Sequence, residues 1–305
     1  MREGLRIGTR GSILAMRQTQ WVAARLTEHH PDLPLHIEIL KTTGDRIQDA
    51  PLAKLGSVGV FTRELDLALR EGQIDVAVHS LKDVPTSPAP GVALAAIPER
   101  EDPRDVFVGR FAPRLLELPS GASVGTGSLR RRALLAALRP DLQAVELRGN
   151  IDTRLRKLRE SDVMEGIILA AAGVLRTGMS DVITEWLDVD AWLPAPGQGA
   201  LAIAVRSDDA RACNVVRVLE HPPTRTAVTA ERALLACVES GCHAPVGAFG
   251  FVSGSDLSLD AFVASPTGGR MVRLQAEGPA QEAARLGEQL AARLLREGGR
   301  EILDA

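Results

Sequence analysis

Cysteine is scarce in this 305-residue chain, and its pattern limits the kinds of site that the chain can hold. The three cysteines are Cys213, Cys237 and Cys242, and they form no C-x-x-C pair and no disulfide framework. An odd number of cysteines is consistent with a reducing compartment. The N-terminal residues also lack the basic-then-apolar pattern of a secretory signal. We therefore expect a cytoplasmic protein.

Long apolar runs and a strong net charge are also missing. The longest apolar run, 167–175, is at most half of what a membrane-spanning helix needs, so we expect no membrane partner. The formal net charge is −3, which argues against a general nucleic-acid binder. With 45% apolar and 25% charged residues, the composition is that of a globular protein, and the length suffices for two or three domains.

Lysine is rare, whereas arginine is abundant. Only four of the 36 basic residues are lysines, and the other 32 are arginines. The planar guanidinium suits two-point recognition of carboxylate or phosphate groups. The arginine bias therefore favours an anionic ligand, although it could also reflect nothing more than genome composition.

Strands and helices alternate over the first two thirds of the chain. Apolar patterns predict strands at 5–8, 36–40, 74–78, 105–108, 144–147, 166–170 and 201–205, with helices after most of them. Alternation of this kind is typical of doubly wound α/β domains with a parallel sheet. From about Pro222 the pattern changes to one helix, three β segments and a final helix, which predicts a small α+β module with a three-stranded antiparallel sheet.

Linkers near residues 100 and 197 suggest three domains. We expect an α/β domain 1 formed by 1–99 together with 197–217. An inserted α/β domain 2 would cover 100–196. An α+β domain 3 would cover 218–305.

The segment Gly125–Arg132 carries three arginines at the predicted start of a helix, directly after a strand and a glycine turn. Ser128 is a good N-cap, and Pro140 ends the element. A dinucleotide fingerprint is incomplete because Arg130 stands where its third glycine should be. Two interpretations stay open at this point: an anion site built from the helix start with Arg130 and Arg131, or a tight turn with solvent-facing arginines.

Further arginines follow other predicted strands: Arg10, Arg148, Arg154 and Arg176. Ligands of open α/β sheets bind outside the carboxyl ends of the strands. One arginine in such a place is usually solvated surface. Four of them indicate a ligand with several negative charges.

Lys82 and Asp83 lie at the end of another predicted strand. A carboxylate beside a lysine there can act as an acid, a base or a stabiliser of a cation. The alternative is a surface ion pair at a turn.

Cys242 lies in a glycine-flanked loop, where a thiol is accessible. Cys237, Cys242 and His243 lack the spacing of metal ligands, so we expect no metal site.

Taken together, the motifs resemble those of the hydroxymethylbilane synthase (porphobilinogen deaminase) family over essentially the whole chain. The matching segments are Thr9–Ala15, His79–Pro85, Arg100–Asp105, Gly125–Arg131, Leu147–Leu155, Ile168–Gly173, Pro196–Ala200 and Glu231–Arg232 with Gly241–Cys242. The resemblance implies two periplasmic-binding-protein-like α/β domains and a small C-terminal domain that carries a cofactor cysteine.

The resemblance also implies an activity and a set of site residues. It implies a monomeric transferase that joins four porphobilinogen molecules head to tail, with loss of ammonia, into a linear tetrapyrrole. The primer would be a dipyrromethane cofactor bound covalently to Cys242. The residues carried over are Asp83 and Lys82 for catalysis, with Thr126, Ser128, Arg130 and Arg131 for the cofactor and Arg10, Ser12, Phe61, Arg148, Arg154 and Arg176 for the substrate.

This chemistry agrees with the arginine pattern because each porphobilinogen carries an acetate and a propionate group. We expect the polar, glycine-bearing segment 42–59 to be a lid over the growing chain. A rival interpretation is a non-catalytic two-lobed binding protein for a polycarboxylate. The extra domain and the accessible Cys242 count against that rival.

Overall fold

The computed structural model describes residues 4–40, 62–238 and 245–304, and the chain divides into two compact units. Unit 1 comprises Met1–Glu101 and Ala200–Arg225. Unit 2 comprises Asp102–Gly199 and Thr226–Ala305. The division into three domains stays a prediction.

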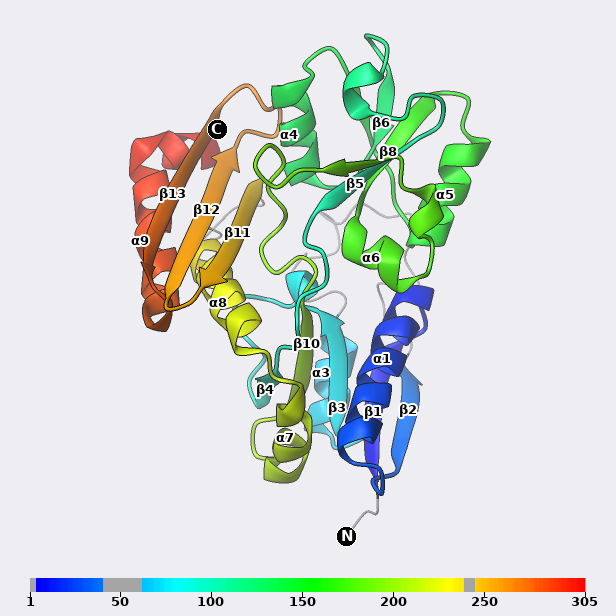
Figure 1. The fold of residues 1–305 in the computed structure, drawn as a ribbon, viewed down its shortest axis with the longest axis vertical. Coiled ribbons are helices and arrows are strands. Elements are labelled where there is room, and N and C mark those ends of the chain that lie inside the picture. Colours follow the sequence, from blue (N-terminus) through cyan, green and yellow to red (C-terminus); the bar gives the residue numbers. More distant parts are fainter. Residues whose placement is uncertain (1–3, 41–61, 239–244, 305) are drawn as a thin grey trace. The chain divides into compact units, whose positions relative to one another are not determined.

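Unit 1 is built on a five-stranded sheet with the order β2-β1-β3-β10-β4 (Figure 1). Its strands are β1 (Leu5–Arg10), β2 (Leu35–Leu40), β3 (Val76–Ser80), β4 (Val92–Ala96) and β10 (Leu201–Arg206). Helices cover both faces: α1 (Ile13–His29) and α7 (Ala210–Val216) pack against one core, and α3 (Arg63–Arg70) packs against the other. Alternation within β3 explains this arrangement, because Val76 and Val78 enter the first core and Ala77 the second.

Unit 2 contains a second five-stranded sheet with the order β7-β6-β8-β5-β9. Its strands are β5 (Asp105–Gly109), β6 (Ser123–Gly125), β7 (Gln143–Val145), β8 (Met164–Ala170) and β9 (Glu185–Leu187). Helix α4 (Leu129–Leu138) covers one face, and α5 (Ile151–Glu160) with α6 (Ala171–Arg176) covers the other. The doubly wound α/β class predicted from the sequence is confirmed for both sheets.

Neither sheet is fully parallel, which corrects the sequence prediction in one respect. Strand β10 runs antiparallel to β3 and β4, and β5 runs antiparallel to β8 and β9. Each reversed strand is the first one after the chain passes from one unit into the other, at 199–200 and at 101–102. Such a strand enters its sheet from a separate unit and not from a neighbouring helix, so the right-handed crossover that makes successive strands parallel does not apply to it.

The C-terminal part of unit 2 is the small α+β module that the sequence predicts. Helix α8 (Pro222–Val238) precedes the antiparallel strands β11 (Val246–Ser253), β12 (Asp256–Ala264) and β13 (Met271–Pro279), and α9 (Ala283–Leu294) and α10 (Arg300–Leu303) follow. The order β11-β12-β13 confirms the predicted three-stranded sheet (Figure 1). Its core is formed by small and branched side chains of α8, the strands and α9.

Two contacts fix this module against the second sheet within unit 2. Phe262 and Ala264 of β12 belong to the core that also holds α4. Gly268, at the β12–β13 turn, has a positive φ of 70°, and a Cβ there would lie 2.5 Å from the Ala133 carbonyl oxygen. Only glycine therefore allows the turn to approach α4 so closely.

A buried carboxylate ties the segment before β10 to the module. Glu231 of α8 is fully buried and accepts hydrogen bonds from the backbone N–H of Gly197 at 2.6 Å and of Gly250 at 2.9 Å. Bonds of this charge-assisted kind are stronger than neutral ones.

Among the described helices, none is long and apolar enough to cross a membrane.

Candidate functional site

Asp83 and Lys82 lie on a short 3₁₀ turn, Leu81–Asp83, that follows β3 directly in unit 1. The turn is held by Leu81, whose side chain is fully buried and whose N–H donates to the Ala200 carbonyl oxygen at 2.9 Å. Val84 N–H closes the turn on the Leu81 carbonyl oxygen. Lys82 and Asp83 are both exposed. The carboxylate can therefore reach a ligand at the strand end, as the sequence predicts.

The neighbouring strand β1 brings two more predicted residues to the same edge. Strands β1 and β3 are parallel, so the carboxyl end of β1, with Arg10 and then Ser12, lies at the edge where β3 ends. The Ser12 hydroxyl caps α1 by accepting a hydrogen bond from Ala15 N–H at 3.3 Å. The cap is a structural role for Ser12 that is independent of a substrate.

A hydrogen bond between α1 and the last residue of β3 fixes this strand end. Gln18 of α1 is buried and donates from its Nε2 to the Ser80 hydroxyl at 2.9 Å. His79, one residue earlier, is 6% exposed, and its Nε2 is buried with no hydrogen-bond partner in the described part of the chain. Burial, with a smaller contribution from the Arg10 charge, lowers the pKa of His79 to about 4. The imidazole is therefore neutral at pH 7.

In unit 2, Arg130 and Arg131 are buried around one carboxylate that the sequence prediction did not include. Asp105, the first residue of β5, is completely buried, and the two arginine side chains are 5% and 6% exposed. Asp105 Oδ2 accepts from Arg130 Nη2 at 2.7 Å and from Arg131 Nε at 3.1 Å. Asp105 Oδ1 accepts from Arg131 Nη2 at 2.7 Å. Arg130 and Arg131 therefore do not face solvent.

Two further donors complete the shell of Asp105. Trp192 donates from its indole Nε1 at 2.9 Å, and Gln198 donates from its Nε2 at 2.8 Å. Burial alone would raise the pKa of Asp105, but the charges of Arg130 and Arg131 together hold it far below its usual range. Asp105 is thus ionised, and its oxygens carry five hydrogen bonds.

The sequence contained a signal for Asp105 that could have been used. A carboxylate that opens an apolar strand, here Asp-Val-Phe-Val, must be buried with that strand, and a buried carboxylate needs cations or several donors. Gln198 and Trp192 had no comparable signal, because a buried amide or indole looks like any loop residue until the fold is known.

Thr126 and Ser128 shape the turn that leads into α4. Thr126 is buried, and its hydroxyl accepts from Ser128 N–H at 3.2 Å. The Ser128 hydroxyl accepts from Arg131 N–H at 3.4 Å, which confirms the predicted N-cap. Arg132, the third arginine of the segment Gly125–Arg132, is partly buried and paired with Glu146.

The remaining arginines follow β7 and β8 of unit 2 along the chain, but only Arg148 lies near a strand end, because Arg154 belongs to α5 and Arg176 is the last residue of α6. Each of the three has a partner. Arg148 pairs with Glu146 at 2.7 Å, Arg154 donates to the Gly149 carbonyl oxygen at 2.7 Å, and Arg176 donates to the Gly199 carbonyl oxygen at 2.7 Å. These bonds engage part of the hydrogen-bonding edge of each guanidinium. Their assignment to a substrate stays a prediction.

Three sequence predictions fall on residues outside the described ones: Phe61, Cys242 and the segment 42–59. The described residues include no group of three or more His, Cys, Asp and Glu side chains that could hold a metal ion.

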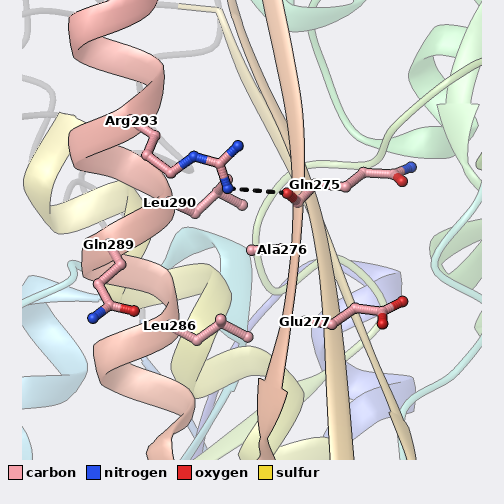
Figure 2. A pocket seen from close by; sticks show the side chains of 7 residues that line it. All are labelled: Gln275, Ala276, Glu277, Leu286, Gln289, Leu290 and Arg293. Atoms are coloured by element: carbon pink, nitrogen blue, oxygen red, sulfur yellow. Dashed lines mark hydrogen bonds between the residues drawn. The ribbon is translucent and has the colours of Figure 1, made fainter.

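A pocket does occur between α9 and β13, where Arg293 Nη1 donates to the Gln275 carbonyl oxygen at 3.4 Å (Figure 2). None of the residues predicted for the site lines this pocket.

Fold and site residues together define a class: an α/β protein with two doubly wound sheets, in which cationic groups and the exposed carboxylate of Asp83 follow the strands. Solved structures with a similar fold include the methionine-binding protein MetQ, with a TM-score of 0.45, 12% identity and coverage of 71% of this chain and 89% of that one.

Sequence comparison identifies the family within that class. Residues 5–214 match the model "Porphobilinogen deaminase, dipyromethane cofactor binding domain", and residues 225–296 match "Porphobilinogen deaminase, C-terminal domain". The porphobilinogen deaminase of Geobacter sulfurreducens is 48% identical over 98% of this chain and 93% of its own length. That of Desulforudis audaxviator is 48% identical over 99% and 98%. The chain belongs to the porphobilinogen deaminase family.

Proposed function

We propose that this chain is a transferase that joins four porphobilinogen molecules head to tail, releasing ammonia at each step, to give the linear tetrapyrrole hydroxymethylbilane. Family membership over nearly the whole chain carries this proposal. The exposed carboxylate of Asp83 at the end of β3 is the observation in the structure that supports it most directly.

Asp83 has two tasks in the proposed mechanism. At each step the bond between the aminomethyl carbon and nitrogen of porphobilinogen breaks, and the electron pair leaves with the nitrogen as ammonia. The resulting cationic pyrrole is then attacked by the free ring carbon of the growing chain, which forms a carbon–carbon bond and afterwards loses its proton. A fixed carboxylate stabilises both cationic stages and can carry the proton, which is the usual work of a general acid–base group.

Lys82 and the strand-end arginines bind the acetate and propionate groups in this account. Arg10 and Ser12 would do so at the end of β1, Arg148 after β7, Arg154 from α5 and Arg176 from the end of α6. Guanidinium groups suit this task because they form paired, charge-assisted hydrogen bonds with carboxylates. Phe61 would pack against the pyrrole rings, and the segment 42–59 would act as a lid.

The dipyrromethane cofactor supplies a covalently held primer with a free pyrrole end, and we assign its attachment to Cys242. The residues around Arg130 fit such a group because one carboxylate, Asp105, is buried against two guanidiniums, and Arg130 Nε has no hydrogen-bond partner among the described residues. We therefore assign Thr126, Ser128, Arg130, Arg131 and Lys82 to its carboxylates. Asp83 is itself a carboxylate, so we assign it to the pyrrole rings of the cofactor.

The domain boundaries, the monomeric state and a cytoplasmic location belong to the same proposal. The near-neutral net charge supports a protein that binds no nucleic acid. The test is a turnover assay with purified protein and porphobilinogen. Formation of hydroxymethylbilane with one ammonia per porphobilinogen consumed is expected, and binding without turnover would favour the rival two-lobed binding protein.

A further inference from the structure

Glu146, the residue directly after β7, contacts two arginines of unit 2 with its carboxylate. Its Oε1 accepts a hydrogen bond from Arg148 Nε at 2.7 Å, and its Oε2 accepts one from Arg132 Nη2. Arg148 follows two residues later along the chain, whereas Arg132 belongs to the first turn of α4. The carboxylate of Glu146 therefore joins the end of β7 to the start of that helix.

The same carboxylate lies against the turn that leads into α4. A Cβ at Gly127 would lie 3.3 Å from Glu146 Oε1, so the glycine allows the carboxylate to approach the turn closely. Thr126 and Ser128, on either side of Gly127, are two of the residues that the proposed function assigns to ligand carboxylates. A carboxylate of the protein itself thus lies beside a region proposed to bind the carboxylates of the ligand.

The pair of Glu146 and Arg148 is accessible, and Arg148 does not depend on it for its position. The side chain of Glu146 is 49% exposed and that of Arg148 is 27% exposed. Ion pairs as accessible as this are weak. The backbone of Arg148 is held separately, because Lys157 Nζ donates to its carbonyl oxygen at 3.2 Å. Another carboxylate can therefore replace Glu146 on a guanidinium whose backbone stays in place.

We propose that Glu146 competes with the carboxylates of the substrate for Arg148, and that the displaced Glu146 stays bound to Arg132. This inference rests on the proposed function, in which Arg148 binds an acetate or propionate group. It adds a residue that sets the affinity of that contact. The substrate gains its charge-assisted bond to Arg148 only as Glu146 gives one up, so the net gain in affinity is reduced.

The direction of the change in KM distinguishes competition from support. Removing the charge of a competitor strengthens substrate binding, so KM falls. If Glu146 only held Arg148 in a productive orientation, its loss would weaken binding, and KM would rise. Competition acts on the free enzyme before the substrate binds, so it changes KM and leaves kcat as it is.

The test compares Glu146→Gln with Glu160→Gln in steady-state assays of porphobilinogen consumption. Glu160 pairs with Arg156 on the surface of α5, and both side chains are 59% exposed. Each variant removes one negative charge from unit 2, so a general effect of net charge on an anionic substrate appears in both. We expect KM to fall about two- to fivefold in Glu146→Gln, with kcat unchanged, and to stay at the wild-type value in Glu160→Gln. An unchanged or raised KM in Glu146→Gln would overturn the proposal.

Arg132→Gln tests the second half of the proposal. Without Arg132, Glu146 pairs with Arg148 alone and competes more strongly, so KM should rise. In the double variant Glu146→Gln/Arg132→Gln that rise should be absent, and KM should equal that of Glu146→Gln. A similar rise in both backgrounds would show that Arg132 binds the substrate itself and would contradict its assigned task. A wild-type protein that does not consume porphobilinogen would instead refute the proposed function, and the inference with it.

Discussion

Asp105 and Arg131 form a two-point ion pair in the interior of unit 2, with Nη2–Oδ1 at 2.7 Å and Nε–Oδ2 at 3.1 Å. The pair joins the first residue of β5 to the first turn of α4, and Trp192 and Gln198 bind the same carboxylate. An ion pair buried this fully is kept stable only by such complete hydrogen bonding.

Removing the carboxylate should therefore destabilise the protein strongly. We expect Asp105→Ala to lower the free energy of unfolding by about 3–5 kcal/mol, since two buried guanidiniums lose their counter-ion. Urea denaturation followed by circular dichroism measures this. Glu28→Ala is the control, because Glu28 pairs with Arg25 on the surface and its side chain is 57% exposed. Its loss should cost at most about 1 kcal/mol. Similar losses in the free energy of unfolding for the two variants would show that the buried ion pair stabilises the protein no more than a surface pair does.

Asp83→Ala should fold and carry the cofactor but lose nearly all turnover. The side chain is exposed, so its removal leaves the core intact. A general acid–base group contributes roughly 10²- to 10⁴-fold to a rate, and we expect a loss of that size in porphobilinogen consumption. Asp208→Ala, on the exposed turn after β10, is the matched control and should keep the wild-type rate. A wild-type rate in Asp83→Ala would contradict the role assigned to Asp83.

His79 should make the stability of the protein depend on pH between about 6.5 and 4. Burial lowers its pKa to about 4 in the folded state, so below pH 6.5 the unfolded chain binds a proton that the folded chain does not. Stability is therefore fully present above pH 6.5 and is lost as the pH falls toward 4, by up to about 3 kcal/mol.

Thermal unfolding at pH 7 and pH 5 measures this effect. In His79→Gln the difference in unfolding temperature between the two pH values should shrink. In His29→Gln, which changes an exposed histidine at the end of α1, it should stay as in the wild type. An unchanged pH difference in His79→Gln would mean that another group causes it.

Much of the fold follows from the sequence because its signals are local. Alternation in β3 and the cap at Ser128 needed no knowledge of distant contacts. Strand direction does depend on distant contacts, so the sequence did not predict that β5 and β10 run antiparallel to their neighbours. The short strands β4 and β9 were also missed, since an alanine-rich segment and a three-residue segment give little periodic signal.

The candidate site divides in the same way. The positions of residues that directly follow strands, such as Asp83 and Arg148, can be predicted from the order of strands along the chain. The partners of a residue cannot be predicted in this way, because Arg130, Trp192 and Gln198 are far from Asp105 in sequence and contact it only in the folded chain. Sequence patterns could therefore place Arg130 and Arg131 at the start of an anion-binding helix. They could not show that both side chains are already paired with a buried carboxylate.

The intact mass of the purified wild-type protein, made in a host that supplies porphobilinogen, tests the central claim most directly. The account predicts a mass greater than that of the 305 residues by two pyrrole units, lost when Cys242 is changed to serine. A pink colour with Ehrlich's reagent should accompany the added mass. A wild-type mass equal to that of the bare chain would contradict the claim that this protein carries a covalent dipyrromethane primer.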